Sequence, residues 1–98
     1  MTKYYFEFNN YEYYGLVVSE ANTYGEALQK SYQIYQSVIA GESIQDVMNE
    51  GRPTHISEKD AFVKFIQASK HEDLTVFELV DDFYSSVDTA VLVDYALV

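Results

Sequence analysis

The chain has 98 residues, of which 48% are apolar and 16% aromatic, and its formal net charge is −10. This apolar content is too high for a disordered chain, so we expect a single acidic domain over residues 1–98. Cysteine is absent, which excludes disulfides, a thiol nucleophile and a cysteine zinc site. The first residues lack a long apolar run, and no segment reaches the ~18 apolar residues of a membrane span. We therefore expect a cytoplasmic protein without membrane contacts.

Two segments near the start, residues 3–8 and 12–18, are rich in tyrosine, phenylalanine and valine, which is typical of β-strands. A hairpin with a two-residue loop would place Glu7 opposite Glu12, and facing like charges disfavour a strand pair. We therefore predict a three-residue loop, residues 9–11.

The predicted register divides the hairpin into two faces. The core face would carry Tyr4, Phe6, Phe8, Tyr14, Leu16 and Val18. The opposite face would carry Tyr5, Glu7, Tyr13 and Val17. Tyr5 and Tyr13 should then lie near each other, on a face that water or a partner must cover.

Residues 23–40 have the longest unbroken helical pattern of the chain. Thr23 and Glu26 form a capping box at its start, and Gly41 can take the left-handed conformation that ends a helix. Its apolar face should pack on a sheet through Tyr24, Leu28 and Tyr35.

Two further helices are predicted before the chain reaches its last quarter. Ser43 and Asp46 indicate a two-turn helix that ends near Gly51, and residues 51–54 contain the only proline and form the main loop. Ser57 and Asp60 begin a helix that continues to about Ala68, with Phe62, Phe65 and Ile66 on its buried side.

Beyond residue 73 the composition changes to β-branched and aromatic residues. We predict a strand at residues 74–80, a connection at 81–86 and a second strand at 87–98, which together form a second hairpin. An amphipathic helix over residues 87–98 is the alternative. The predicted fold class is α+β, with two layers, in the order ββαααββ. An antiparallel sheet of about four strands would be packed on one face by the helices that begin at Thr23 and Ser57.

Catalytic motifs are absent from the sequence. The chain has no glycine-rich phosphate loop, nucleophile elbow or zinc-protease motif, and the only histidines are His55, in the proline loop, and His71, at a helix exit. Oxygen ligands near residues 81–88 could hold a divalent cation, although aspartate and serine are also ordinary turn residues. We expect no catalytic site, no cofactor and no metal.

Charge is distributed unevenly along the chain. All six lysines and arginines lie at or before Lys70, whereas residues 72–98 hold seven carboxylates and no basic residue. Such a field repels nucleic acids and anionic membranes and steers the protein toward basic surfaces. Carboxylates two residues apart on a strand lie roughly 6.6–6.8 Å apart, close to the phosphate spacing of DNA, so imitation of DNA is one form of this hypothesis. A solvated acidic surface is the simpler interpretation.

Ten tyrosines are a second notable feature of the composition. Tyrosine suits half-buried strand positions and is also favoured at protein interfaces. In size, acidity, tyrosine content and lack of cysteine, the chain resembles the small accessory proteins of bacteriophages and mobile elements, among which inhibitors of nucleic-acid enzymes occur. This resemblance is one of composition and assigns no residue.

Taken together, these features predict a non-catalytic module that binds a basic protein surface, for example that of a nucleic-acid-binding protein. The candidate contact residues are Tyr5, Glu7, Tyr13, Asp81, Asp82, Tyr84 and Asp88. One alternative is a structural homodimer joined through the aromatic sheet face or an edge strand. Another is a small enzyme that uses carboxylates at Asp81, Asp82 or Asp88.

Overall fold

The computed structural model describes residues 1–9, 13–40, 44–49, 51–69 and 76–94. The strands are β1 (Thr2–Phe8), β2 (Tyr14–Ala21), β3 (Thr54–Ile56) and β4 (Thr89–Asp94). The helices are α1 (Tyr24–Ile34), the π-helix η1 (Tyr35–Ala40), α2 (Ile44–Asn49), α3 (Glu58–Ser69) and α4 (Val76–Ser85). Predictions for residues 10–12, 41–43, 70–75 and 95–98, including those for Gly41, Ser43 and His71, lie outside the described residues.

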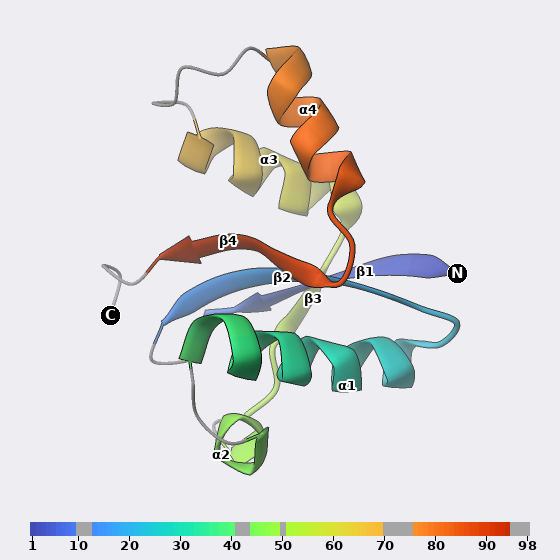
Figure 1. The fold of residues 1–98 in the computed structure, drawn as a ribbon, viewed down its shortest axis with the longest axis vertical. Coiled ribbons are helices and arrows are strands. Elements are labelled where there is room, and N and C mark those ends of the chain that lie inside the picture. The colour runs from blue at the N-terminus through green and yellow to red at the C-terminus, as the bar shows by residue number, and fades with distance from the viewer. Residues whose placement is uncertain (10–12, 41–43, 50, 70–75, 95–98) are drawn as a thin grey trace.

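The four strands form one antiparallel sheet in the order β3-β1-β2-β4, and helices pack on it (Figure 1). This confirms the predicted α+β class with a four-stranded antiparallel sheet. The predicted sequence of elements is wrong in two places, because β3 follows α2 and α4 replaces the strand at residues 74–80.

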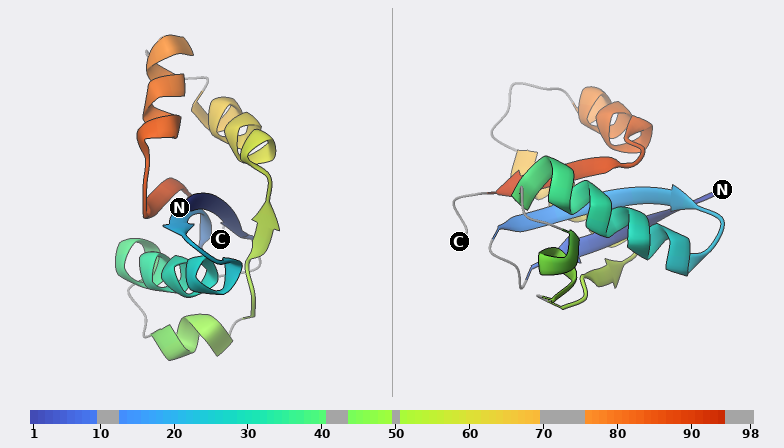
Figure 2. Two further views of the ribbon diagram at one scale, coloured as in Figure 1. Left: turned by 90° about the vertical axis from the view of Figure 1, so that its right-hand side faces the viewer. Right: turned by 60° about the horizontal axis from the view of Figure 1, so that its bottom comes forward.

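Helices cover both faces of the sheet, whereas the prediction placed them on one face. The α1 side of the core contains Phe6, Phe8 and Val17, and the α3–α4 side contains Tyr5 together with residues of both helices. Figure 2 shows α1 and α2 on one side of the strands and α3 and α4 on the other. The physical reason is that successive side chains of β1 and β2 alternate between two apolar faces, and each face needs a cover.

The hairpin exists, but its predicted register is wrong. Phe8 pairs with Gly15, three residues beyond the predicted partner Glu12, and Thr2 pairs with Ala21. A shift by an odd number of residues turns β2 over relative to β1. Leu16 and Val18 therefore share a face with Tyr5 under α3 and α4, and Val17 shares the α1 face with Phe6 and Phe8.

The long helix begins as predicted and ends differently. The Thr23 hydroxyl accepts a hydrogen bond from the backbone N–H of Glu26 at 3.2 Å, which caps α1. Leu28 and Tyr35 are buried as predicted, but Tyr24 is 42% exposed, which contradicts the prediction. The last six residues, from Tyr35, form a π-helix.

The π-helix fits closely over Gly15 of β2. A Cβ atom at Gly15 would lie 2.5 Å from the Ile39 Cδ1 atom and 3.4 Å from the Tyr35 ring. The Tyr35 hydroxyl donates a hydrogen bond to the Tyr13 carbonyl at 2.8 Å, which fixes η1 to the start of β2. The absence of a side chain at Gly15 is what allows this approach.

The middle of the chain follows the predictions more closely. A two-turn helix, α2, is present, and α3 begins where the Ser57 hydroxyl accepts a hydrogen bond from the Asp60 N–H at 3.0 Å. Phe65 is buried, and Phe62 and Ile66 are partly buried against the same cluster. The strand β3, which pairs with β1, was not predicted.

The main error concerns the last quarter. Residues 76–85 form the helix α4, so the predicted strand at 74–80, the connection at 81–86 and the second hairpin are wrong. The strand prediction for residues 87–98 is confirmed over β4, which excludes the helical alternative there, and β4 pairs with β2.

Replacement of Phe83 by alanine tests the position of α4. Phe83 is 1% exposed and stacks on Tyr5 with a ring-centroid distance of 5.3 Å, so Phe83→Ala should lower the free energy of unfolding by about 3–5 kcal/mol. Phe77→Ala on the same helix is the matched control: its side chain is 87% exposed, and its effect should stay within about 0.5 kcal/mol. Urea denaturation measures both, and equal effects would contradict this orientation of α4.

A second prediction concerns the contact between η1 and β2. Gly15→Ala should lower the free energy of unfolding by about 1–3 kcal/mol, because the new methyl group overlaps the Ile39 Cδ1 atom. Ile39→Val removes that atom, so the double variant should lose less than the two single variants combined. Strict additivity in urea denaturation would show that this overlap is not the cause.

Candidate functional site

The helix α4 separates apolar and charged side chains into two faces. Leu79 and Phe83 are 6% and 1% exposed and point into the core beneath the helix. The exposed positions are Phe77, Glu78, Asp81, Asp82, Tyr84 and Ser85. Residues three and four apart are neighbours on a helix, so Phe77, Asp81 and Tyr84 form one stripe, with Glu78 and Asp82 beside it. We call Phe77, Glu78, Asp81, Asp82 and Tyr84 the outer face of α4.

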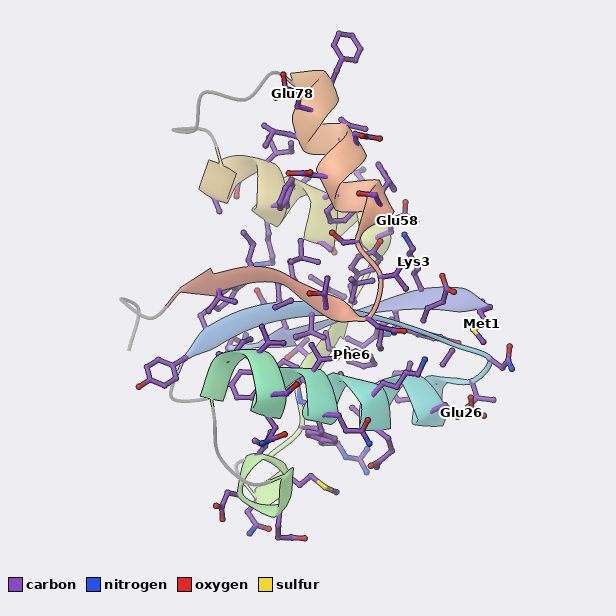
Figure 3. The ribbon with its side chains drawn as sticks, viewed as in Figure 1. Met1, Lys3, Phe6, Glu26, Glu58 and Glu78 are labelled. Atoms are coloured by element: carbon purple, nitrogen blue, oxygen red, sulfur yellow. The ribbon has the colours of Figure 1, made fainter. Side chains whose placement is uncertain are left out.

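Two carboxylates of this face, those of Asp81 and Asp82, are not neutralised by a neighbouring cation among the described residues. Residues 76–94 contain no lysine or arginine. Within the part of the chain that the structure describes, the Asp81 and Asp82 side chains form no ion pair. Figure 3 shows Glu78 at the end of α4 that is remote from the sheet. The outer face therefore presents negative charge to the solvent.

Two of these charges, those of Asp81 and Asp82, gain little from the helix dipole, whereas Glu78 lies in the first turn, where the dipole favours an anion. Asp81 and Asp82 are near the C-terminus of α4, where the helix dipole favours cations, and Glu78 and Asp82 are like charges four residues apart. Each placement typically costs a few tenths of a kcal/mol. Local stability of α4 therefore does not explain Asp81 and Asp82.

Tyr84 lies at the opposite end of the outer face, next to α3. Its ring stacks on Phe62, with 5.7 Å between the ring centroids. Desolvation and the Glu58 carboxylate raise the pKa of Tyr84. Lys3 donates a hydrogen bond from Nζ to the Tyr84 carbonyl at 2.6 Å, which satisfies one acceptor at the end of α4. Figure 3 shows Lys3 and Glu58 near this end of the helix. Tyr84 remains 44% exposed.

Asp88 has a structural role, separate from the outer face. Its carboxylate accepts hydrogen bonds from the Glu20 N–H at 2.8 Å and from Lys30 Nζ at 3.4 Å, and it forms an ion pair with Lys30. Its backbone has a φ of 50°, which aspartate tolerates better than most residues. Asp88 thus holds the turn before β4 against β2 and α1, and it is not grouped with Asp81 and Asp82.

Tyr5 is placed where no partner can reach it. It is 2% exposed beneath α3 and α4, and its hydroxyl has no hydrogen-bond partner among the described residues. Burial, with smaller contributions from Glu58 and Tyr84, raises the pKa of Tyr5 to about 12. The predicted proximity of Tyr5 and Tyr13 is also wrong, since Tyr13 packs against the core on the α1 side.

Glu7 is likewise a buried structural residue. It is 7% exposed, and its Oε2 atom lies 2.8 Å from Lys64 Nζ of α3 and accepts a hydrogen bond from the Tyr14 hydroxyl at 2.8 Å. Asn9 donates a further hydrogen bond to Oε1 at 3.4 Å. Burial, followed by the hydrogen bond to Glu7, raises the pKa of Tyr14. A buried carboxylate requires such partners, and here they join α3 to β1 and β2.

Of the seven predicted contact residues, Asp81, Asp82 and Tyr84 therefore share one exposed surface. Tyr5 and Glu7 are buried, and Asp88 is exposed but paired with Lys30. Tyr13 is partly buried. Sequence analysis missed Glu78 as a neighbour of Asp81 and Asp82, and it missed Phe77 altogether. The signal was available, because apolar residues at 76, 79, 80 and 83 have helical spacing and leave Phe77 on the outer side.

The described residues contain neither a membrane-spanning helix nor a cluster of metal ligands. No helix in the described ranges is long and apolar enough to cross a membrane. No three or more histidine, aspartate or glutamate side chains in those ranges are grouped so that they could hold a metal ion.

Comparison with known proteins identifies the family. Residues 3–93 match the YosH C-terminal domain family. The chain therefore belongs to this family, whose name states no activity or partner. No curated protein and no solved structure matches the chain significantly.

The buried Tyr5 hydroxyl leads to a pH-dependent prediction. A pKa raised to about 12 means that the folded state favours the neutral phenol. This contribution to stability is complete below about pH 10, the ordinary pKa of tyrosine, and is lost as the pH rises through the folded value. Tyr5→Phe should therefore weaken the alkaline loss of stability. At pH 7 it should be neutral or stabilising by about 1 kcal/mol, because it removes an unsatisfied buried hydroxyl.

Tyr35→Phe is the matched control, because it removes a hydroxyl that donates to the Tyr13 carbonyl. It should destabilise the protein at pH 7 by about 1 kcal/mol. Urea denaturation at a series of pH values measures both variants. A loss of more than about 1 kcal/mol at pH 7 in Tyr5→Phe would show that its hydroxyl has a partner in solution.

Proposed function

We propose that this member of the YosH C-terminal domain family is a non-catalytic protein-binding module that engages a basic partner protein through the outer face of α4. The observation that carries the proposal is the set of three exposed carboxylates, Glu78, Asp81 and Asp82, on a helix without any basic residue. Exposed charge of one sign steers association with surfaces of the opposite sign.

The class of partner follows from the charge. A net charge of −10 opposes contact with nucleic acids and anionic membranes, so a basic protein is the best match. Nucleic-acid-binding proteins are one such class, and an accessory protein that inhibits one of them is a specific form of the proposal. The strand spacing that suggested imitation of DNA no longer applies to Glu78, Asp81 and Asp82, because they lie on a helix.

The two alternatives receive less support. Two outer faces in a symmetric homodimer would bring like charges together. At the β4 edge, the pairing with β2 shifts between Leu16 and Val17, and such an irregularity disfavours continuous pairing with another strand. The enzymatic alternative placed the chemistry at Asp81, Asp82 or Asp88, but Asp88 is engaged with Lys30 and the Glu20 N–H, and Asp81 and Asp82 lie exposed on a helix.

Charge removal on α4 tests the proposal. The intact protein is immobilised, proteins that it captures at low salt are identified, and a purified partner is then studied by binding kinetics. Asp81→Asn/Asp82→Asn should slow association most at low ionic strength, because charges are screened within about 10 Å at 0.1 M salt. The free energy of unfolding should change by less than about 0.5 kcal/mol.

The matched control is Glu26→Gln/Asp46→Asn, which removes the same charge from α1 and α2 on the other side of the sheet. It should affect association much less than the α4 variant. If captured partners are acidic, or if both double variants act equally at every salt concentration, the outer face of α4 is not the binding surface.

A further inference from the structure

Phe77 is the most exposed large apolar side chain among the described residues, at 87%. It belongs to the first turn of α4, whereas Leu79 and Phe83 of the same helix are buried. Single exposed apolar residues are common on protein surfaces, so exposure alone identifies no site. The position of Phe77 is what indicates a binding surface. Phe77 shares a stripe of α4 with Asp81 and lies next to Glu78 in the sequence.

The surrounding charge restricts what could cover Phe77. A second copy of the chain could dock symmetrically on this face. Each copy would then bring Glu78, Asp81 and Asp82 close to the same three residues of the other copy, and the repulsion between these like charges opposes such a dimer. An anionic membrane and a nucleic acid are disfavoured for the same reason. A protein surface that offers both positive charge and an apolar pocket satisfies all of these residues together.

We propose that the outer face of α4 docks into an amphipathic basic site of a partner protein, with the Phe77 ring in an apolar pocket and lysine or arginine side chains opposite Glu78, Asp81 and Asp82. This inference rests on the proposed function and specifies the chemistry of the partner. It corresponds to the mode in which one face of a helix enters a groove. Aromatic anchors of this kind supply much of the affinity of an interface.

The two kinds of contact have different kinetic signatures. The carboxylates act mainly on the association rate and are screened by salt. The Phe77 ring contributes through apolar burial, which salt screening does not weaken, and it acts mainly on dissociation. Variants of the two groups should therefore be distinguishable in one set of measurements.

Two synthetic peptides serve as probes. One is an amphipathic helix with a leucine stripe and a lysine stripe, and the other has the same length and the same lysines, with serine in place of each leucine. Binding to the intact protein is measured by titration calorimetry at about 50 mM and about 300 mM salt. The leucine peptide should bind at least about tenfold more tightly than the serine peptide.

Variants of the protein separate the apolar contribution to peptide binding from the contribution of charge. Phe77→Ala should remove most of the preference for the leucine peptide, while Val38→Ala, a 49% exposed apolar control on the opposite side of the sheet, should leave it unchanged. Asp81→Asn/Asp82→Asn should weaken binding of both peptides, less so at the higher salt concentration. Retention of the preference in Phe77→Ala would overturn the anchor role, while a charge effect on both peptides would leave the proposed function intact.

Two other outcomes have distinct meanings. If the charge variant binds both peptides as well as the natural sequence does, the proposed function fails whatever the effect of Phe77→Ala. If the protein sediments as a dimer that Phe77→Ala converts to a monomer, a second copy occupies the face and the inference is wrong.

Discussion

The central strands β1 and β2 are apolar on both faces, and the rest of the architecture depends on this constraint. Phe6, Phe8 and Val17 face α1, while Tyr5, Leu16 and Val18 face α3 and α4, and all six are at most 2% exposed. A sheet with one wet face would leave half of these side chains in water. Each apolar side chain of this size gains roughly 1.5–3 kcal/mol on full burial, so both helical layers are needed.

The α3–α4 layer is also joined to the sheet by a polar connection, which is centred on Glu7. Glu7 faces α3 from a buried position, and Lys64, Tyr14 and Asn9 supply its partners. A lone buried carboxylate would be expensive, whereas one with several donors is tolerated and constrains geometry. Because Lys64 belongs to α3, its ion pair with Glu7 links the orientation of that helix to β1. The position of α4, which packs on α3 through Phe62 and Phe83, follows from it.

Signals carried by neighbouring residues predicted much of the fold. The signals that indicate how strands pair, and in which register, predicted less. Thr23 and Ser57 mark helix starts through capping that needs only neighbouring residues, and both were predicted correctly. The register of β2 depends on a loop whose length the sequence does not fix. The run of Leu16, Val17 and Val18 nevertheless indicated a strand buried on both faces, because a half-exposed strand would alternate. At α4, β-branched and aromatic composition favoured a strand, although the apolar spacing was helical.

That error changes how the acidic residues act together. In the predicted arrangement, Glu78 lay on the strand at residues 74–80, whereas Asp81 and Asp82 lay in the connection after it, so the three carboxylates had no common face. On α4 the same three residues gather on one side, because Leu79 and Phe83 occupy the side that packs against Tyr5 and α3. Burial of the apolar residues thus dictates that the carboxylates and Phe77 emerge together. A surface that combines charge and an aromatic ring follows from the amphipathic division of one helix, and the uneven distribution of charge along the chain becomes a directional feature of the folded protein.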